Sequence, residues 1–405
     1  MRVKHSMLSL IKRSRNSAAI KRVGRKGMAT KEASSKDDKK LFKDWFDDQA
    51  AKALASQLRR ADSSFPTKKF TRLATQNLAS LEFAGRVNQF AAALAACLPD
   101  EMSESLAIIR TSFPPPLPDC EAVTDGWLQW PIGQYIADRG LEHFNDSMLT
   151  MLELTQRFSS EFAVRPFVEH RQRETIQYLR NLTDHESPHV RRWCSEGLRT
   201  RLPWGKKLHQ LIADPKPVLP ILEALKDDEE IYVRRSVANN LNDISKDHPE
   251  LVVNRCRKWF VESKPDRVTL VKQALRGLIK DGQAEALALI GFGKPKKLSA
   301  KLELSAKKIP VGGTITLSAT LTSAAASDQD LLIDYAIHYV RKNNSSSAKV
   351  FKWKTLTVQP GESVTISKKH AFKATTIRAL YPGKHLVELQ INGLRVATSA
   401  FTLSA

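Results

Sequence analysis

The sequence predicts a multidomain α plus β protein, in which an all-α body of helical repeats is followed by a β-sandwich. Three observations lead to this fold class. Apolar residues recur at helical spacing from Leu41 to about Leu289, a segment of that region repeats after 43 residues, and the last third of the chain alternates apolar and polar residues between turns. A chain of 405 residues is long enough for two or three domains with cores of their own.

The first 40 residues form a basic segment with few large apolar side chains. They hold 13 basic and three acidic residues, and such a composition buries too little surface to offset chain entropy. We therefore expect residues 1–40 to be a disordered arm. Two alternatives stay open: the stretch up to Lys31 has no acidic residue, as in a mitochondrial presequence, or the start codon is misassigned and translation begins at Met28.

From Leu41 onward the apolar spacing predicts helices. Phe90, Leu94 and Leu98 follow one another at four-residue steps, which places them on one helical face. Four prolines between Ser112 and Asp119 exclude a helix there, because proline lacks an N–H donor and clashes with the preceding turn. We expect a connecting loop at that point within an otherwise helical domain, residues 41–295.

A repeat lies within this helical domain. The string DHESPHVRR, residues 184–192, recurs in altered form as DDEEIYVRR, residues 227–235, and the register holds to Leu198 against Leu241. A period between about 40 and 47 residues, with an acidic turn before a Val-Arg helix, is typical of HEAT-like helical pairs. Such pairs stack into a curved solenoid whose second helices line a concave face.

The hydrophobic period changes after the basic residues 294–297. Apolar and polar side chains alternate in runs such as Ile333 to Tyr339, and turn dipeptides such as Pro360-Gly361 separate the runs. About seven short strands over residues 298–405 predict a β-sandwich of immunoglobulin-like type, here without a bridge between cysteines.

Positive charge is concentrated at the two ends of the chain. Of the net charge of +21, residues 1–40 and 296–405 contribute +10 each, while the 35 basic and 34 acidic residues between them nearly cancel. Solubility alone does not require two basic ends, so we expect a polyanionic partner.

Several other classes of protein are excluded. No apolar run approaches the roughly 18 residues of a membrane span, and four well-separated cysteines argue against a disulfide framework and for a reducing cytoplasm. His185 to His189 fit the HExxH zinc pattern only as a string, because Pro188 interrupts the helix that would align the two histidines. Glycine-rich nucleotide motifs are missing too, so neither a metal nor another cofactor is expected.

One helix of the repeat carries the candidate chemistry. Val190, Cys194 and Leu198 repeat every four residues and are expected to face the solenoid core. The opposite face should then point outward, and it carries His189, Arg192, Trp193, Glu196 and Arg199. The alternative is that Trp193 packs against the neighbouring repeat and that Glu196 only pairs with an arginine.

Three strings in this region are long and specific: RFSSEFAVRPF at residues 157–167, HVRRWCSEGLRTRLPWG at residues 189–205, and VRRSVANNLND at residues 233–243. They resemble the HEAT-like-repeat DNA alkylation-repair glycosylases, specifically the AlkC-type branch. The resemblance covers roughly residues 41–290, and some members of the branch also carry a C-terminal immunoglobulin-like domain, which matches residues 298–405.

The resemblance implies base excision repair of alkylation damage in duplex DNA. It implies that cationic bases such as 3-methyladenine and 3-methylcytosine are released by hydrolysis of the N-glycosidic bond, without a cofactor and without deep base flipping. It assigns Glu161, Glu196 and Asp243 as candidate catalytic carboxylates, and Trp193 and Trp204 as aromatic residues that contact the lesion. The expected protein is a monomeric, monofunctional hydrolase of the bacterial cytoplasm that associates with the nucleoid through DNA.

Elementary chemistry agrees with this activity. A cationic base is already a good leaving group, so the enzyme has to stabilise positive charge on the sugar, which a carboxylate does. Tryptophan faces attract a cationic base. The DNA backbone would be bound by the basic side chains Arg191, Arg192, Arg234, Arg235, Lys206, Lys207, Arg341, Lys342 and Lys352.

Two other functions stay open on sequence grounds. Helical repeats also serve as non-catalytic scaffolds, and a basic solenoid could recognise DNA structure by shape alone. A scaffold needs the arginines but not Trp193 beside Glu196, which favours the glycosylase.

Overall fold

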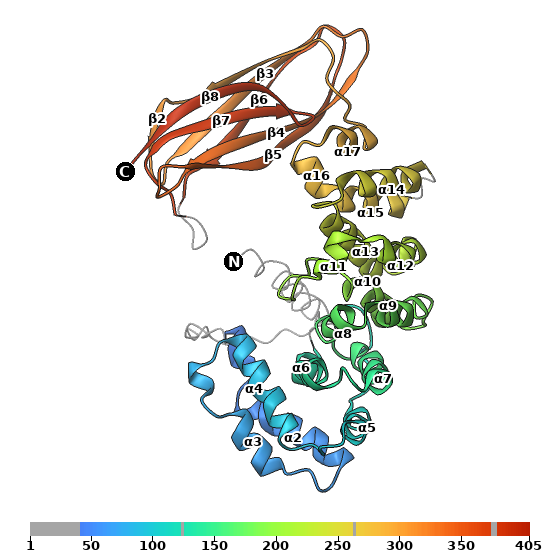
Figure 1. The fold of residues 1–405 in the computed structure, drawn as a ribbon. Helices are drawn as coiled ribbons and strands as arrows, with labels where there is room; N and C mark the ends of the chain where they lie inside the picture. The colour runs from blue at the N-terminus through green and yellow to red at the C-terminus, as the bar shows by residue number, and fades with distance from the viewer. Residues whose placement is uncertain (1–40, 123–124, 262–264, 374–378) are drawn as a thin grey trace, which may run out of the picture. The chain divides into compact units, whose positions relative to one another are not determined.

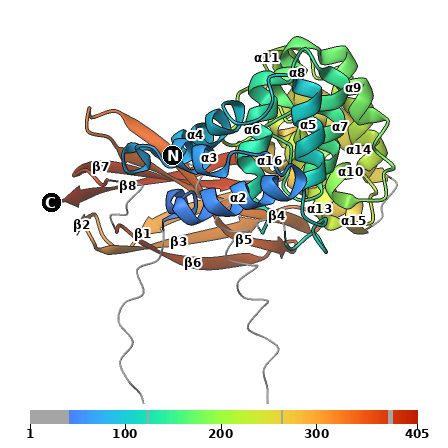
Figure 2. The ribbon, with the colours of Figure 1, turned by 90° about the horizontal axis from the view of Figure 1, so that it is seen from below.

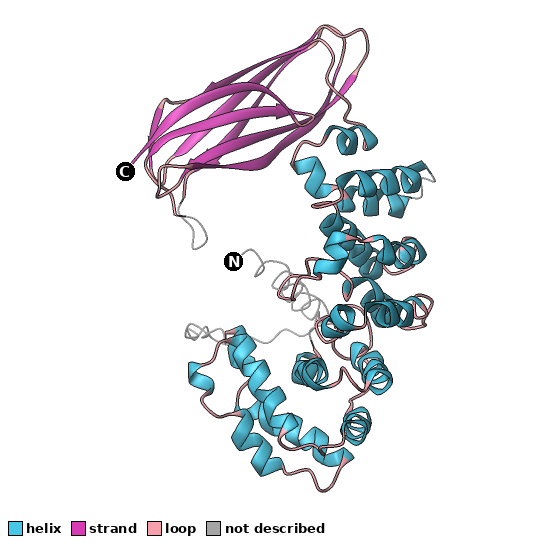
Figure 3. Ribbon diagram, in the orientation of Figure 1, coloured by secondary structure: helices cyan, strands magenta, loops and turns pink. Residues whose placement is uncertain are grey.

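The computed structural model describes residues 41–122, 125–261, 265–373 and 379–405, so the predicted basic arm lies outside the described residues. Among the described residues, helices follow one another from Phe42 to Leu289, and strands follow from Leu298 to Ser404 (Figures 1 and 3). The predicted fold class, an all-α repeat body followed by an immunoglobulin-like β-sandwich, is confirmed. In the described ranges, no helix has the length and apolar character needed to cross a membrane.

The chain divides into two compact units, Met1–Asp243 and Ile244–Ala405. The division therefore falls near the end of a helix, whereas the change from helices to strands comes later, after Leu289. The described helices of the first unit are α2 (Asp48–Ala61), α3 (Thr67–Ala74), α4 (Phe83–Ala95), α5 (Met102–Ser112), α6 (Trp130–Arg139), α7 (Phe144–Thr155), α8 (Arg165–His170), α9 (Gln172–Arg180), α10 (Pro188–Glu196), α11 (His209–Ala213), α12 (Leu219–Leu225) and α13 (Ile231–Ile244), with 3-10 turns η1 (Phe42–Trp45), η2 (Leu78–Ser80), η3 (Trp127–Gln129) and η4 (Lys216–Val218).

The 43-residue repeat corresponds to two helix pairs, α9 with α10 and α12 with α13. The positions predicted to face the core are fully buried in both copies: Val190, Cys194 and Leu198, and 43 residues later Val233, Val237 and Leu241. Helix α10 packs against both α9 and α12, so the two pairs share one core.

Proline accounts for two helix ends: α5 stops at Ser112 before the proline-rich stretch, and α10 starts at Pro188, where a missing N–H costs nothing.

The second unit joins four helices to the sandwich. Its helices are α14 (Pro249–Val261), α15 (Pro265–Ala274), α16 (Arg276–Lys280) and α17 (Ala284–Leu289). Its strands are β1 (Leu298–Leu304), β2 (Lys308–Pro310), β3 (Thr314–Ser323), β4 (Gln329–Val340), β5 (Ser346–Val358), β6 (Ser363–Ala371), β7 (Gly383–Ile391) and β8 (Leu394–Ser404).

Two sheets form the layers of the sandwich (Figures 1 and 2). One has the strand order β1-β3-β6 and the other β2-β8-β7-β4-β5. Alternate residues of β4, such as Ile333 and Ile337, are fully buried in the core between the sheets. The sequence predicted about seven strands, and the eighth is β2, a three-residue edge strand that pairs in parallel with β8 and is too short for an alternating pattern to reveal.

The β7–β8 turn connects the sandwich to the preceding helices within the second unit. The amide nitrogen of Asn392 donates to the carbonyl oxygen of Gly293 at 2.7 Å, and its amide oxygen accepts from the backbone N–H of Leu332 at 2.7 Å. Next to it, Gly393 lies against Gly282, and a Cβ at position 393 would come within 2.6 Å of the Gly282 backbone. Glycine at both positions therefore permits this close approach.

Replacing Gly393 by alanine is expected to destabilise the second unit more than the same change at Gly361. Both glycines have positive φ, 78° and 73°, so each alanine costs about 1–2 kcal/mol in backbone conformation. Only at Gly393 does the new methyl group also meet backbone atoms, which adds about 1–3 kcal/mol, whereas nothing lies within 4 Å at Gly361. Denaturant unfolding of both variants measures the difference, and equal losses would show that the Gly282 contact is unimportant.

Candidate active site

Three carboxylates and two arginines alternate in one buried chain of ion pairs in the first unit. Arg192 lies between Glu161 and Glu196, with an Nη1 to Oε2 distance of 2.7 Å and an Nη2 to Oε1 distance of 3.4 Å. Arg199 lies between Glu196 and Asp243, with Nη1 to Oε1 and Nη2 to Oδ2 distances of 2.7 and 2.8 Å. The carboxylates predicted from the sequence therefore come together, linked by two arginines of the same helical region.

Each carboxylate comes from a different segment. Glu161 lies just before α8, Glu196 ends α10, and Asp243 lies in the last turn of α13. The repeat accounts for the approach of α10 and α13, since they are the second helices of successive pairs, and Asn240 Nδ2 joins them by donating to the carbonyl oxygen of Ser195 at 2.8 Å. Ser159 completes the set by donating its hydroxyl to Glu161 Oε2 at 2.9 Å.

The arginines keep the central carboxylate ionised despite its burial. Burial by itself raises the pKa of Glu196, but the charges of Arg192 and Arg199 outweigh it and hold this pKa well below the usual range. Burial likewise lowers the pKa of Arg199, but Glu196 and Asp243 raise it by more. The result is a desolvated array of alternating carboxylates and arginines, in which each carboxylate is held in place by hydrogen bonds.

The predicted outward face of α10 is wrong. Trp193 is fully buried, and His189, Glu196 and Arg199 are also buried. The reason is that α10 is covered on its second face as well: Gly197 lies so close to Val164 that a Cβ there would be 2.8 Å from Cγ1, and α13 bonds to the helix through Asn240. Trp193 is therefore a core residue, and the prediction that it contacts the lesion is corrected.

Trp204 has the exposure that Trp193 lacks. Its side chain is 42% exposed, and it follows α10 in a loop with a φ of 70°, in the left-handed region. Its ring stacks on Trp130 at a centroid distance of 6.1 Å, and Trp130 in turn stacks on Phe162 at 5.1 Å. The centroid of the Phe83 ring lies 5.7 Å from that of the Trp204 ring.

These aromatic residues line a hollow of about 480 Å³ on the first unit. Polar side chains also line it, among them Asp138, whose pKa is raised by burial, and Arg165. Phe162 directly follows Glu161 in sequence, so the aromatic hollow and the carboxylate chain meet at one segment. Sequence reasoning missed Trp130, Phe162 and Arg165, although the last two stand inside the string RFSSEFAVRPF next to Glu161.

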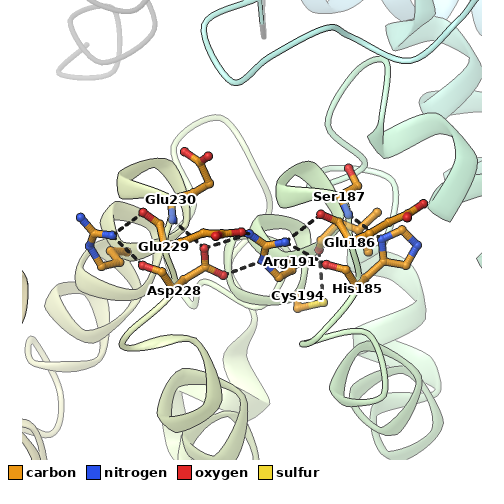
Figure 4. A network of polar contacts seen from close by, with 10 residues as sticks. His185, Glu186, Ser187, Arg191, Cys194, Asp228, Glu229 and Glu230 are labelled. Atoms are coloured by element: carbon orange, nitrogen blue, oxygen red, sulfur yellow. Dashed lines mark hydrogen bonds and ion pairs between the residues drawn. The ribbon is translucent and has the colours of Figure 1, made fainter.

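Arg191 is engaged in joining the two repeats (Figure 4). It donates from Nε and Nη2 to the two carboxylate oxygens of Asp228, at 2.6 and 3.1 Å, and from Nη1 to the carbonyl oxygens of His185 and Glu186. Its equivalent 43 residues later, Arg234, donates in the same way to the carbonyl oxygens of Asp228 and Glu229. The prediction that Arg191 binds DNA phosphate is thus contradicted, because its guanidinium is buried and its donors are occupied.

The other predicted DNA contacts differ in exposure. Arg192 is half-buried and lies 4.8 Å from the centre of the Tyr232 ring, besides its carboxylate partners. Arg234 is likewise partly buried, and its Nη1 donates to backbone carbonyl oxygens. The other candidates are exposed: Lys206 and Lys207 beside Trp204, Arg235 on α13, Arg341 and Lys342 in the β4–β5 turn, and Lys352 on β5.

Among the described residues, no group of three histidine, cysteine, aspartate or glutamate side chains is placed to hold a metal ion. His185 precedes α10 and accepts the backbone N–H of Ser187, whereas His189 lies within the helix, so the two histidines of the HExxH string do not share a helix.

The fold and site together define a helical-repeat protein with a C-terminal immunoglobulin-like domain and a buried chain of carboxylate–arginine ion pairs. Comparison with known proteins identifies the group. Residues 153–276 match the family described as "DNA alkylation repair enzyme", and residues 299–405 match the C-terminal Ig-like domain of uncharacterised protein YhaZ. The chain belongs to the DNA alkylation repair enzymes of AlkC type that carry this Ig-like domain.

Two relatives match nearly the whole chain. "Uncharacterized protein YhaZ" of Bacillus subtilis (strain 168) is 34% identical over 354 residues, which cover 87% of this chain and 96% of that protein. The structure of Pseudomonas fluorescens alkylpurine DNA glycosylase AlkC, bound to DNA containing an abasic site analog, is 34% identical and matches with a TM-score of 0.81, covering 90% of this chain and 99% of that one.

Proposed function

We propose that this protein is a DNA glycosylase that hydrolyses the N-glycosidic bond of cationic N-alkylated bases in duplex DNA and so initiates base excision repair. The observation that carries the proposal is the buried chain from Glu161 to Asp243, together with Phe162, the residue after Glu161, which lines the same hollow as the exposed Trp204. The similarity to an alkylpurine DNA glycosylase over 90% of the chain supports it. The substrates would be bases of the 3-methyladenine and 3-methylcytosine type.

The chemistry would be charge stabilisation. When the bond between C1′ and the alkylated base breaks, its electron pair neutralises the base, and positive charge develops on the deoxyribose. Carboxylates held in a desolvated site stabilise that charge by about 3 kcal/mol. A water molecule then adds to C1′ and releases a proton.

Glu161 is the carboxylate best suited to accept from that water. Its Oε2 is occupied by Arg192 and Ser159, while its Oε1 accepts no hydrogen bond from the described residues. Glu196 has arginines on both sides and would act mainly through its charge. None of these steps requires a lysine nucleophile, so the proposed enzyme is a monofunctional hydrolase that needs no cofactor.

Trp204 would contact the lesion. An indole face attracts a cationic base with about 0.5–2 kcal/mol, and Trp204 is the exposed end of the stack with Trp130 and Phe162. A surface ring of this kind suits a mechanism in which the damaged nucleotide is not swung into a deep pocket. We also propose that the protein acts as a monomer in the bacterial cytoplasm, associated with the nucleoid.

Incubation with alkylated duplex DNA tests this function directly. The purified protein should release methylated bases, identified by chromatography, and leave abasic sites without strand cleavage. Binding to the same DNA without any release would instead support a DNA-structure-binding protein, and no binding would support a scaffold.

The immunoglobulin-like domain is proposed to bind the DNA backbone through its β4–β5 hairpin. Replacing Arg341, Lys342 and Lys352 by glutamine should weaken binding and flatten its salt dependence by up to about 0.9 per lost phosphate contact in a log–log plot from about 50 to 200 mM salt. The matched control replaces Lys301, Lys307 and Lys308, which are exposed elsewhere on the sandwich and carry the same charge. Equal slopes for wild type and the hairpin variant would exclude the hairpin from DNA binding.

A further inference from the structure

A buried arginine joins the two halves of the proposed site. Arg165 is the first residue of α8, four residues after Glu161, and only 2% of it is exposed. Although burial lowers the pKa of Arg165 to about 10, its guanidinium remains charged at neutral pH. Glu161 and Asp243 are among the charges that stabilise its cationic form.

The donors of Arg165 go to the backbone of one loop. We call residues 197–208 the Trp204 loop. Arg165 Nη1 donates to the carbonyl oxygens of Gly197 and Arg199, at 3.3 and 3.1 Å, near the start of the loop. Its Nε and Nη2 both donate to the carbonyl oxygen of Lys206, near the end, with an Nε distance of 2.7 Å. One side chain therefore holds both ends of the loop.

The loop is built to accept this side chain. Gly205 lies so close to Arg165 that a Cβ there would be 3.1 Å from both Cδ and Nε. The loop also closes on itself, because the N–H of Leu208 donates to the carbonyl oxygen of Thr200 at 3.2 Å. Between these contacts stands Trp204, whose left-handed conformation is unfavourable for an L-residue and persists only where surrounding bonds hold it.

The same side chain also affects the carboxylates. Arg199, whose carbonyl oxygen accepts from Arg165, is the residue whose guanidinium joins Glu196 to Asp243. Arg165 thus holds the backbone of a residue in the carboxylate chain and, through the Lys206 carbonyl, the backbone next to the exposed tryptophan.

We infer that Arg165 is a positioning residue for the proposed reaction: by binding both ends of the Trp204 loop, it holds Trp204 in place for contact with the alkylated base. This inference rests on the proposed glycosylase activity and deepens it. Arg165 contacts no reacting atom, so it would act by positioning Trp204 and, through the backbone of Arg199, the carboxylate chain. Misplacement of a contact by about 1 Å lowers a rate by up to about 100-fold.

A double-mutant cycle tests this dependence. Arg165→Met, Trp204→Ala and the double variant are compared in single-turnover release of methylated bases from alkylated duplex DNA. We expect about a 10-fold or greater loss for each single variant, and a double variant within about threefold of the slower single variant, since both remove the same contact. If the two losses multiply in the double variant, Arg165 acts independently of Trp204 and the inference is wrong.

Two readouts follow the loop without depending on activity. Hydrogen exchange of the amides in residues 200–208 should accelerate in Arg165→Met, and acrylamide should quench Trp204 more strongly, measured as the difference from the same protein carrying Trp204→Phe. Unchanged exchange and quenching would overturn the inference. If the wild-type protein releases no base while hydrogen exchange and quenching both change in Arg165→Met, the proposed function is wrong but Arg165 does hold the Trp204 loop in place.

Further variants keep the test valid if Arg165→Met folds poorly. Arg165→Lys keeps the charge but not the forked donors, and Gly205→Ala crowds the guanidinium without removing it; both should give intermediate loop exchange and release. The matched control is Arg157→Met, which removes an arginine that donates to the carbonyl oxygens of Pro114 and Glu153, outside the Trp204 loop. We expect this control to keep release within about threefold of wild type. If Arg157→Met lost as much activity as Arg165→Met, the loss of any buried arginine that binds backbone carbonyls would impair the enzyme, and the effect would not be specific to the Trp204 loop.

Discussion

Neutralising Glu161 or Asp243 is expected to lower the rate of base release by about 100-fold or more. Each of Glu161→Gln and Asp243→Asn removes a charge that would stabilise the positively charged sugar by about 3 kcal/mol, which corresponds to that loss of rate. DNA affinity should stay nearly unchanged, because these side chains are buried and face arginines. Single-turnover release and equilibrium binding, measured on the same alkylated duplex, separate the two effects.

Glu196→Gln belongs to the same experiment but should also reduce stability. Glu196 lies between Arg192 and Arg199, so its neutralisation leaves two buried guanidinium groups with fewer partners, a change that typically costs several kcal/mol, about 3 to 5. Glu174→Gln is the matched control, since Glu174 is half-exposed on α9 and pairs only with Arg171 among the described ion pairs. Near wild-type release by all three site variants would show that the carboxylate mechanism is wrong.

Replacing the two tryptophans by alanine should give opposite results. Trp193→Ala should lower the free energy of unfolding by about 3–5 kcal/mol, because a fully buried indole is lost from the core between the repeats. Trp204→Ala should change stability far less, since the ring is 42% exposed, and should slow release of cationic bases more than release of any neutral substrate.

Thermal or denaturant unfolding and release assays on paired substrates measure both effects. Trp204→Phe keeps an aromatic face and should retain more activity on cationic lesions than Trp204→Ala. An equal loss on cationic and neutral substrates, together with a large drop in stability for Trp204→Ala, would remove Trp204 from the proposed lesion contact.

The order of helices and strands along the chain could be predicted from local patterns. Periodicity near 3.6 up to Leu289 and near 2 beyond Leu298 reflects which side of an element is buried, and this is a property of a single helix or strand. The 43-residue offset likewise placed Val190 and Val233 correctly, because each repeat buries the same face. The short strand β2 was missed because three residues cannot show a period.

The faces that touch other elements could not be predicted in this way. Helical periodicity located the core side of α10 but treated its other side as exposed, whereas the segment around Val164 and helix α13 cover it and bury Trp193. A single helix carries no signal of what packs on its second face. For the same reason, the pairing of the Arg191 guanidinium with Asp228 could not be predicted, since the two residues are 37 positions apart in the sequence.

By itself, the sequence determined the class of this protein, its two kinds of architecture, its basic ends and the three candidate carboxylates, because composition, period and family-like strings are written along the chain. Only the tertiary structure decided how those carboxylates alternate with Arg192 and Arg199, which tryptophan is exposed, and that Arg165 holds the loop beside it. These properties depend on distances between residues remote in sequence, and on the removal of water when segments pack, which no local pattern encodes.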